Sequence, residues 1–181
     1  MDRRKKIIKT ASLLALFLAL SVLLNFVEYY LPVIVTIPGV KLGLANTMGL
    51  IVLYFFGKEE YALLGFFRVL LVSLLFTGLF SSAFFLSLSG WFLSTIVCIL
   101  LASTKKLSIY SLSIASAISH GIGQILCACI IYSTPYMLTY LPILLFSGLI
   151  SGGLIAFIAS LVIKRIEPYI KSDSLYKIFK K

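Results

Sequence analysis

The strongest constraint on the fold of this chain is a series of long apolar segments, each ended by proline, glycine or charged residues. An α-helix rises about 1.5 Å per residue, so about 20 apolar residues cross a hydrocarbon core of about 30 Å. We therefore predict an all-α integral membrane protein of one domain, residues 1–181, with about six transmembrane helices in one bundle. The second helix is conspicuously short. The predicted spans lie near residues 7–31, 43–56, 60–78, 82–103, 107–132 and 139–164.

The composition agrees with this fold class, because 61% of the residues are hydrophobic and only 12% are charged. A soluble domain has a far more polar balance. The basic start of the chain is like that of a signal peptide, but the apolar stretch from Ile7 to Tyr30 is too long and has no clear small-residue cleavage site. Cysteines occur at three positions inside apolar segments, an odd number that supports neither a disulfide framework nor a zinc site.

The net charge of +10 would also suit a nucleic-acid-binding protein, so the positions of the basic residues decide between the two classes. Fourteen of the sixteen Lys and Arg residues lie in alternate connections: the N-terminus, residues 57–60, residues 103–106 and the C-terminus. Positive charge in alternate loops marks the cytoplasmic side. We predict a multi-pass protein of the cell membrane, in contact with the lipid bilayer, with both termini cytoplasmic and no nucleic-acid partner.

Four ionisable residues have no place in the predicted cytoplasmic loops: Glu28, Lys41, Arg68 and His120. An ionisable side chain at membrane depth costs several kcal/mol unless it faces protein or water, so it usually marks a ligand site or an internal ion pair. Arg68 falls near the middle of the third apolar segment and needs a partner. Two hypotheses remain open, a structural pair with Glu28 and a forked cation for the anionic group of a ligand.

One face of the fifth apolar segment is polar, because Ser116, His120 and Gln124 follow one another at helical spacing. This face indicates either a buried histidine satisfied by a neighbouring hydroxyl or the lining of an outward-opening pocket. A proton relay through His120 and Glu28 is a third interpretation.

The stretch from Ile37 to Asn46 combines a Pro38-Gly39 turn with Lys41 and Asn46, just before the short second helix. A helix start presents free N–H groups and a positive dipole end, which can hold an anion. The pattern predicts a cap over a bound substrate.

Small residues recur every four positions on two segments. Ala11, Ala15 and Ala19 form a stripe on the first, which predicts a face where another helix packs, either inside the chain or in a partner. The spacing of Gly148 and Gly152 in the last segment favours packing within the bundle.

The sequence lacks the residues for several kinds of catalysis. It has no Gly-rich phosphate loop with Lys and Ser or Thr, so any ATP drive must come from another protein. Its only aspartates are Asp2 and Asp173, which rules out the paired aspartate clusters that hold magnesium and diphosphate. We predict that the chain is not an enzyme and has no cofactor and no metal site.

Motifs along nearly the whole chain resemble the Gx transporter family, which is also described as heptaprenyl diphosphate synthase component I. That family is similar to the substrate-binding S components of energy-coupling factor transporters. The motifs are Glu28, Leu31-Pro32, Ile37 to Asn46, Arg68, Gly78, Phe85 to Gly90 and Ser119 to Gln124.

The resemblance implies a six-helix protein that binds a micronutrient near the outer side of the membrane, under a lid formed by Pro38 to Asn46. It implies docking of Ala11, Ala15 and Ala19 on a transmembrane coupling subunit that works with separate ATPase subunits. The implied substrate-binding residues are Glu28, Lys41, Asn46, Arg68, His120 and Gln124.

Three functions follow from these patterns as hypotheses. The first is the substrate-binding subunit of an ATP-driven importer for a small anionic or amphipathic micronutrient or precursor. The second is a membrane accessory subunit of heptaprenyl diphosphate synthase in isoprenoid and menaquinone synthesis, with a soluble prenyl diphosphate synthase subunit as partner. The third is a solitary proton-coupled carrier.

Overall fold

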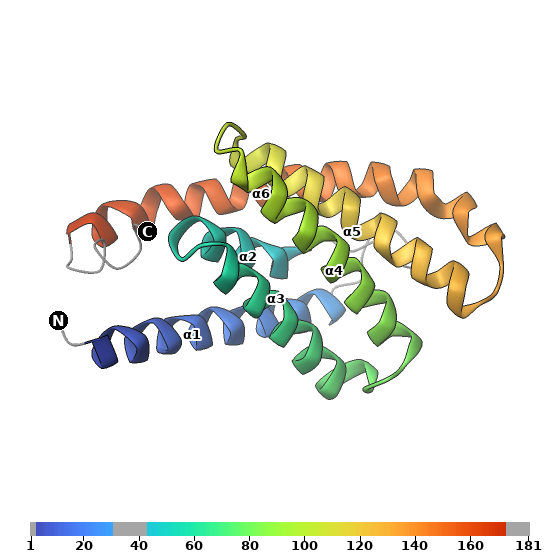
Figure 1. The fold of residues 1–181 in the computed structure, drawn as a ribbon, viewed down its shortest axis with the longest axis horizontal. Coiled ribbons are helices and arrows are strands. Elements are labelled where there is room, and N and C mark those ends of the chain that lie inside the picture. The colour runs from blue at the N-terminus through green and yellow to red at the C-terminus, as the bar shows by residue number, and fades with distance from the viewer. Residues whose placement is uncertain (1–2, 31–42, 173–181) are drawn as a thin grey trace.

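The computed structural model describes residues 3–30 and 43–172, and these form a bundle of α-helices with no strand among them (Figure 1). The all-α fold predicted from the sequence is confirmed. Each predicted span corresponds to one helix, and the last helix extends beyond residue 164. The helices are α1 (Arg3–Tyr30), α2 (Leu44–Phe55), α3 (Lys58–Val72), α4 (Ser82–Ser103), α5 (Ile109–Ile131) and α6 (Leu141–Ser172).

Five of the helical segments are long and apolar enough to cross a membrane, which makes the chain a multi-pass membrane protein. The exception is α2, whose 12 residues rise only about 18 Å. That length is less than the hydrocarbon core of about 30 Å, so α2 alone does not span it. A π-helical turn, η1 (Ser73–Thr77), lengthens α3, and a 3-10 turn, η2 (Pro135–Tyr140), precedes α6.

Local residue chemistry sets where the helices begin. Ser81 and Ser108 are the N-caps of α4 and α5, because their side chains accept hydrogen bonds from the third backbone N–H after them, those of Phe84 and Ser111. Gly57, with φ of 121°, separates α2 from α3 in a conformation that other residues rarely adopt. Gly57 belongs to the glycine signals from which the boundaries were predicted, whereas the two serine caps were not used in that prediction.

The predicted cytoplasmic connections gather at one end of the bundle. The Lys58 ammonium donates a hydrogen bond of 2.7 Å to the Ser103 hydroxyl, which joins the start of α3 to the end of α4. The Tyr54 hydroxyl donates to Glu167 at 3.3 Å, which joins the end of α2 to the far part of α6. The start of α1 and the end of α6 lie at this same end (Figure 1). We call it the basic end; that it faces the cytoplasm stays a prediction.

Glycines let α5 pack closely between α4 and α6. A Cβ added at Gly123 of α5 would lie 2.6 Å from the Ser89 carbonyl oxygen of α4. A Cβ added at Gly152 of α6 would lie 2.8 Å from the Ile114 Cα of α5. In lipid such close backbone approaches drive helix association. The prediction that the glycines of the last segment serve packing within the bundle is confirmed.

The short helix α2 is the most enclosed element and packs on α6. Ile51, Ile155 and Ala159 are all at most 2% exposed in this contact. On its other side α2 meets α1, where the buried Ser21 hydroxyl donates to the Ala45 carbonyl at 3.1 Å. These contacts fix the start of α2 inside the bundle.

The alanine stripe on α1 lies on the surface. Ala11, Ala15 and Ala19 are all exposed, so no described residue of the chain buries this face. The stripe is therefore available to lipid or to a partner helix.

Candidate functional site

A cavity of about 120 Å³ lies inside the bundle, and every one of the six helices contributes to its wall. It is formed where α1 and α3 end and where α2, α4 and α6 begin, so it lies away from the basic end. Its lining residues are Asn25, Glu28, Gly43, Ala45, Asn46, Arg68, Val69, Val72, Ser73, Ser87, Ala117, His120, Gly121, Gln124, Leu144, Ser147, Gly148 and Ser151.

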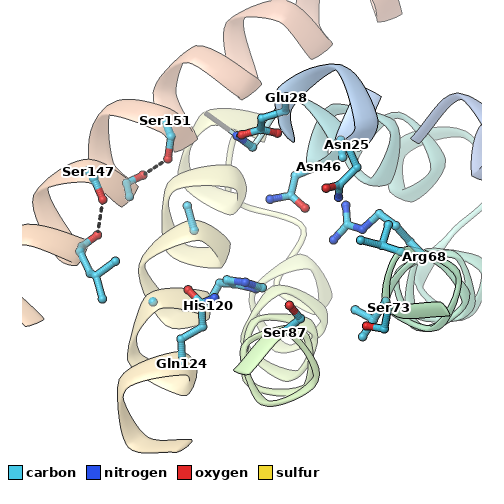
Figure 2. Close-up of a pocket in the computed structure, with 18 residues that line it drawn as sticks. Asn25, Glu28, Asn46, Arg68, Ser73, Ser87, His120, Gln124, Ser147 and Ser151 are labelled. Carbon is cyan, nitrogen blue, oxygen red and sulfur yellow. Dashed lines mark hydrogen bonds between the residues drawn. The ribbon is translucent and has the colours of Figure 1, made fainter. Parts of the chain in front are cut away.

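Five of the six predicted binding residues meet in this cavity although they come from four different helices (Figure 2). They are Glu28, Asn46, Arg68, His120 and Gln124. Lys41 lies outside the described residues, as does the predicted lid before Gly43. The geometry brings these side chains together; that they bind a substrate stays a prediction.

Glu28 joins the end of α1 to the start of α2. Its carboxylate accepts a 2.6 Å hydrogen bond from the Gly43 N–H, and the side chain is only 5% exposed. Gly43 has φ of 76°, a left-handed conformation that glycine adopts without strain and other residues rarely adopt. The negative charge of Glu28 at a helix N-terminus is favourable.

Arg68 extends from α3 into the cavity, and its guanidinium points toward Asn25 and Asn46 (Figure 2). No hydrogen bond joins it to the side chains drawn around it (Figure 2). Within residues 3–30 and 43–172 it forms no ion pair with Glu28, which is hydrogen-bonded to Gly43 instead. The hypothesis of a direct structural pair is therefore not supported by this geometry, and the cation faces the cavity.

The polar face predicted for the fifth segment lines the site. Gln124 lies nearest the C-terminal end of α5, and His120 lies one turn before it in the wall of both cavities. Ser116 lies one further turn before His120, where its hydroxyl and that of Tyr61 share a hydrogen bond of 3.3 Å. A Cβ at Gly90 of α4 would lie 2.7 Å from the His120 ring, so this glycine makes the space for the imidazole.

A second cavity, of about 30 Å³, continues the first toward the middle of the bundle. The two cavities share Asn46, Arg68, Ala117 and His120 in their walls. The inner one is large enough for a water molecule and has polar side chains to hold it. The single tryptophan of the chain, Trp91, lies in its wall.

Several lining residues were not predicted. Asn25 lies three positions before Glu28, and Ser147 and Ser151 are four positions apart, so helical spacing could have found these three. Ser73 and Ser87 carry no comparable signal. Ser147 and Ser151 donate to carbonyls of their own helix, at 3.0 and 3.4 Å, which leaves their oxygens as acceptors toward the cavity.

The chemistry of the lining suits reversible binding of a small polar molecule. The walls carry one arginine and one glutamate, and the other polar groups are amides, hydroxyls and an imidazole. The described residues contain no group of three His, Cys, Asp or Glu that could hold a metal ion. An arginine fork, amide donors and hydroxyls together can hold and orient an oxyanion.

Comparison with known proteins identifies one family. A family model described as heptaprenyl diphosphate synthase component I matches residues 17–162, a stretch that contains every residue lining the large cavity. No curated protein and no solved structure matches the chain. The family resemblance predicted from the sequence is confirmed, and the likeness to S components stays a prediction.

Proposed function

Because this chain belongs to the heptaprenyl diphosphate synthase component I family, we propose that it is the membrane component of a system for polyprenyl diphosphate synthesis. A separate soluble chain supplies the catalysis. The membrane component binds the anionic group of a small molecule in its internal cavity, with Arg68 as the cation.

The observation that carries the ligand-binding part of this proposal is the position of Arg68. Its guanidinium lies in the cavity without an ion pair or hydrogen bond to the described residues around it. A cation at membrane depth is costly unless it is compensated. Glu28 shares the cavity wall but is hydrogen-bonded to Gly43, so a bound anion compensates Arg68 more directly than Glu28 does. The amides of Asn25 and Asn46 lie where they orient that anion.

Two features support the assignment of catalysis to another chain. The sequence has only two aspartates, Asp2 and Asp173, which are too few for the paired aspartate clusters that hold magnesium and diphosphate. The basic end carries exposed Lys105, Lys106 and Arg165, a surface complementary to an acidic soluble protein.

Purification from native membranes tests the partnership. We expect a soluble prenyl diphosphate synthase chain to accompany the membrane protein, because the family is a synthase component. Product formation by that soluble chain should rise when the membrane protein is present in the same vesicles. The soluble chain alone is the control. Recovery of a coupling subunit and ATPase subunits with no synthase chain would contradict this function.

A second candidate function is the substrate-binding subunit of an ATP-driven importer, with a transmembrane coupling subunit and ATPase subunits as partners. The observation that favours it is the exposed stripe of Ala11, Ala15 and Ala19. Such a stripe allows the close approach of a partner helix in lipid.

The importer hypothesis predicts that Ala15→Trp abolishes recovery of a coupling subunit while leaving the fold intact. Ala15 is exposed, so a larger side chain meets no described neighbour in the chain but blocks a partner helix. Leu16→Trp is the matched control, because Leu16 is 55% exposed and lies off the stripe. The measurement is co-purification from native membranes, with thermal unfolding as a check on the fold. Equal recovery with both variants would show that the stripe faces lipid.

A further inference from the structure

We infer that the large cavity takes a small ligand with a single carboxylate head group and discriminates against diphosphates. The inference rests on one part of the proposed function, the binding of a small anion in the cavity. It holds whichever soluble or membrane partner the chain has. It also places the diphosphate chemistry of the system outside this cavity.

The charges in the wall carry the first step of this inference. Among the described lining residues, Arg68 is the only permanent cation and Glu28 the only carboxylate. One carboxylate of a ligand matches the guanidinium fork in geometry and charge. A diphosphate brings several negative charges, and those left over would meet no second cation among the described lining residues and would be repelled by Glu28. Glu28 therefore acts as a filter against highly charged ligands.

The size of the cavity carries the second step. A protein cavity of about 150 Å³ holds a benzene molecule. The present cavity of about 120 Å³ therefore has room for a ligand of similar or slightly smaller size. Butanoate matches benzene in its number of non-hydrogen atoms, whereas diphosphate exceeds it.

The remaining lining residues fit the two ends of such a ligand. Asn25 and Asn46 lie beside the guanidinium and offer amide donors to the same carboxylate (Figure 2). Val69, Val72 and Leu144 supply apolar wall for a short carbon chain. A few convergent polar groups beside apolar wall are typical of a small-molecule site.

Fluorescence of Trp91 gives a test on the full chain in detergent through the residues that the two cavities share. Trp91 is the only tryptophan and shares the wall of the inner cavity with Arg68 and His120. Titration with butanoate should give a saturable change in emission at millimolar concentration. Inorganic diphosphate at the same ionic strength should bind at least about tenfold more weakly, because its extra charges remain uncompensated.

A pair of charge-removing variants tests the filter. Glu28→Gln keeps an oxygen acceptor for the Gly43 N–H but removes the negative charge, so butanoate should bind roughly threefold or more tightly and diphosphate should gain more than butanoate. Glu167→Gln removes the same charge at the basic end, where Glu167 accepts from Tyr54, and should change neither affinity.

The outcomes separate this inference from the proposed function. Tighter binding of diphosphate than of butanoate to the wild-type protein would overturn the carboxylate assignment and leave an anion-binding cavity in place. A failure of both probes to change the emission would overturn this inference and the proposed anion binding in the cavity, and it would leave the partnership with a soluble synthase chain to the co-purification test. Weaker butanoate binding in Glu28→Gln than in the wild type would overturn the role of Glu28 as a filter.

Discussion

Replacing Arg68 by alanine should weaken butanoate binding by at least about 100-fold and should not destabilise the ligand-free protein. Loss of one partner from a buried, hydrogen-bonded charge pair costs about 3 kcal/mol or more, and each 1.4 kcal/mol is about a tenfold change in affinity. The stability of the empty protein should hold because Arg68 makes no ion pair with the described residues around it.

Arg68→Lys separates charge from geometry in the same experiment. Lysine keeps the positive charge but lacks the planar fork that holds both carboxylate oxygens, so its affinity for butanoate should fall between those of the wild type and Arg68→Ala. Binding is measured by Trp91 emission, and stability is measured by thermal unfolding in the same detergent.

The opposite result has a definite meaning for Arg68. If Arg68 stabilises the bundle through Glu28, then Arg68→Ala should lower the unfolding temperature by leaving a buried carboxylate uncompensated. Adding Glu28→Gln to that variant should then restore both stability and butanoate binding. This pattern would assign Arg68 a structural role and would remove the support for Arg68 as the cation that binds the ligand.

Much of the fold was predictable because a membrane protein satisfies its backbone within each helix. Residues that stop helices, such as Gly57, therefore mark the boundaries directly in the sequence. The short second segment was also visible and corresponds to α2. The π-helical turn after Val72 was not predictable, because no residue pattern in Ser73–Thr77 distinguishes it from α-helix.

The ionisable residues of the candidate site were predictable, because such a side chain at membrane depth is costly and therefore stands out in the sequence. That criterion selected Glu28, Arg68 and His120, and the cavity contains all three. It could not select Ser73 or Ser87, because serine is tolerated in membrane helices by bonding its own backbone. Nor could it determine whether Glu28 contacts Arg68 or a backbone N–H, since that depends on how α1 and α2 pack.

The helix α5 contributes to the cavity both through its polar side chains and through its glycines. This helix carries His120 and Gln124 toward the cavity and Gly121 and Gly123 against its neighbours. The polar face and the packing faces therefore lie on one rigid element. A change in the distance between α4 and α5 should alter both the stability of the bundle and the shape of the site.

Gly123→Ala should therefore destabilise the protein and weaken ligand binding together. The added Cβ would lie 2.6 Å from the Ser89 carbonyl oxygen and 3.1 Å from the Gly90 Cα, and neither backbone atom can move away by rotating a side chain. Forcing extra volume into a packed interface costs about 1–3 kcal/mol. The separation of α4 from α5 also moves His120, whose ring lies against Gly90. Thermal unfolding and butanoate titration measure the two effects.

Gly153→Ala is the matched control for this change, since it places the same methyl group on a helix glycine of α6 with no atom within 4 Å. Alanine is favoured over glycine within a helix by about 0.5–1 kcal/mol, so this variant should be as stable as the wild type or slightly more stable. It should also bind butanoate normally, because Gly153 does not line the cavity. Equal stability of the Gly123 and Gly153 variants would mean that α4 and α5 are not in backbone contact at Gly123. The described arrangement of these two helices at the cavity would then be wrong.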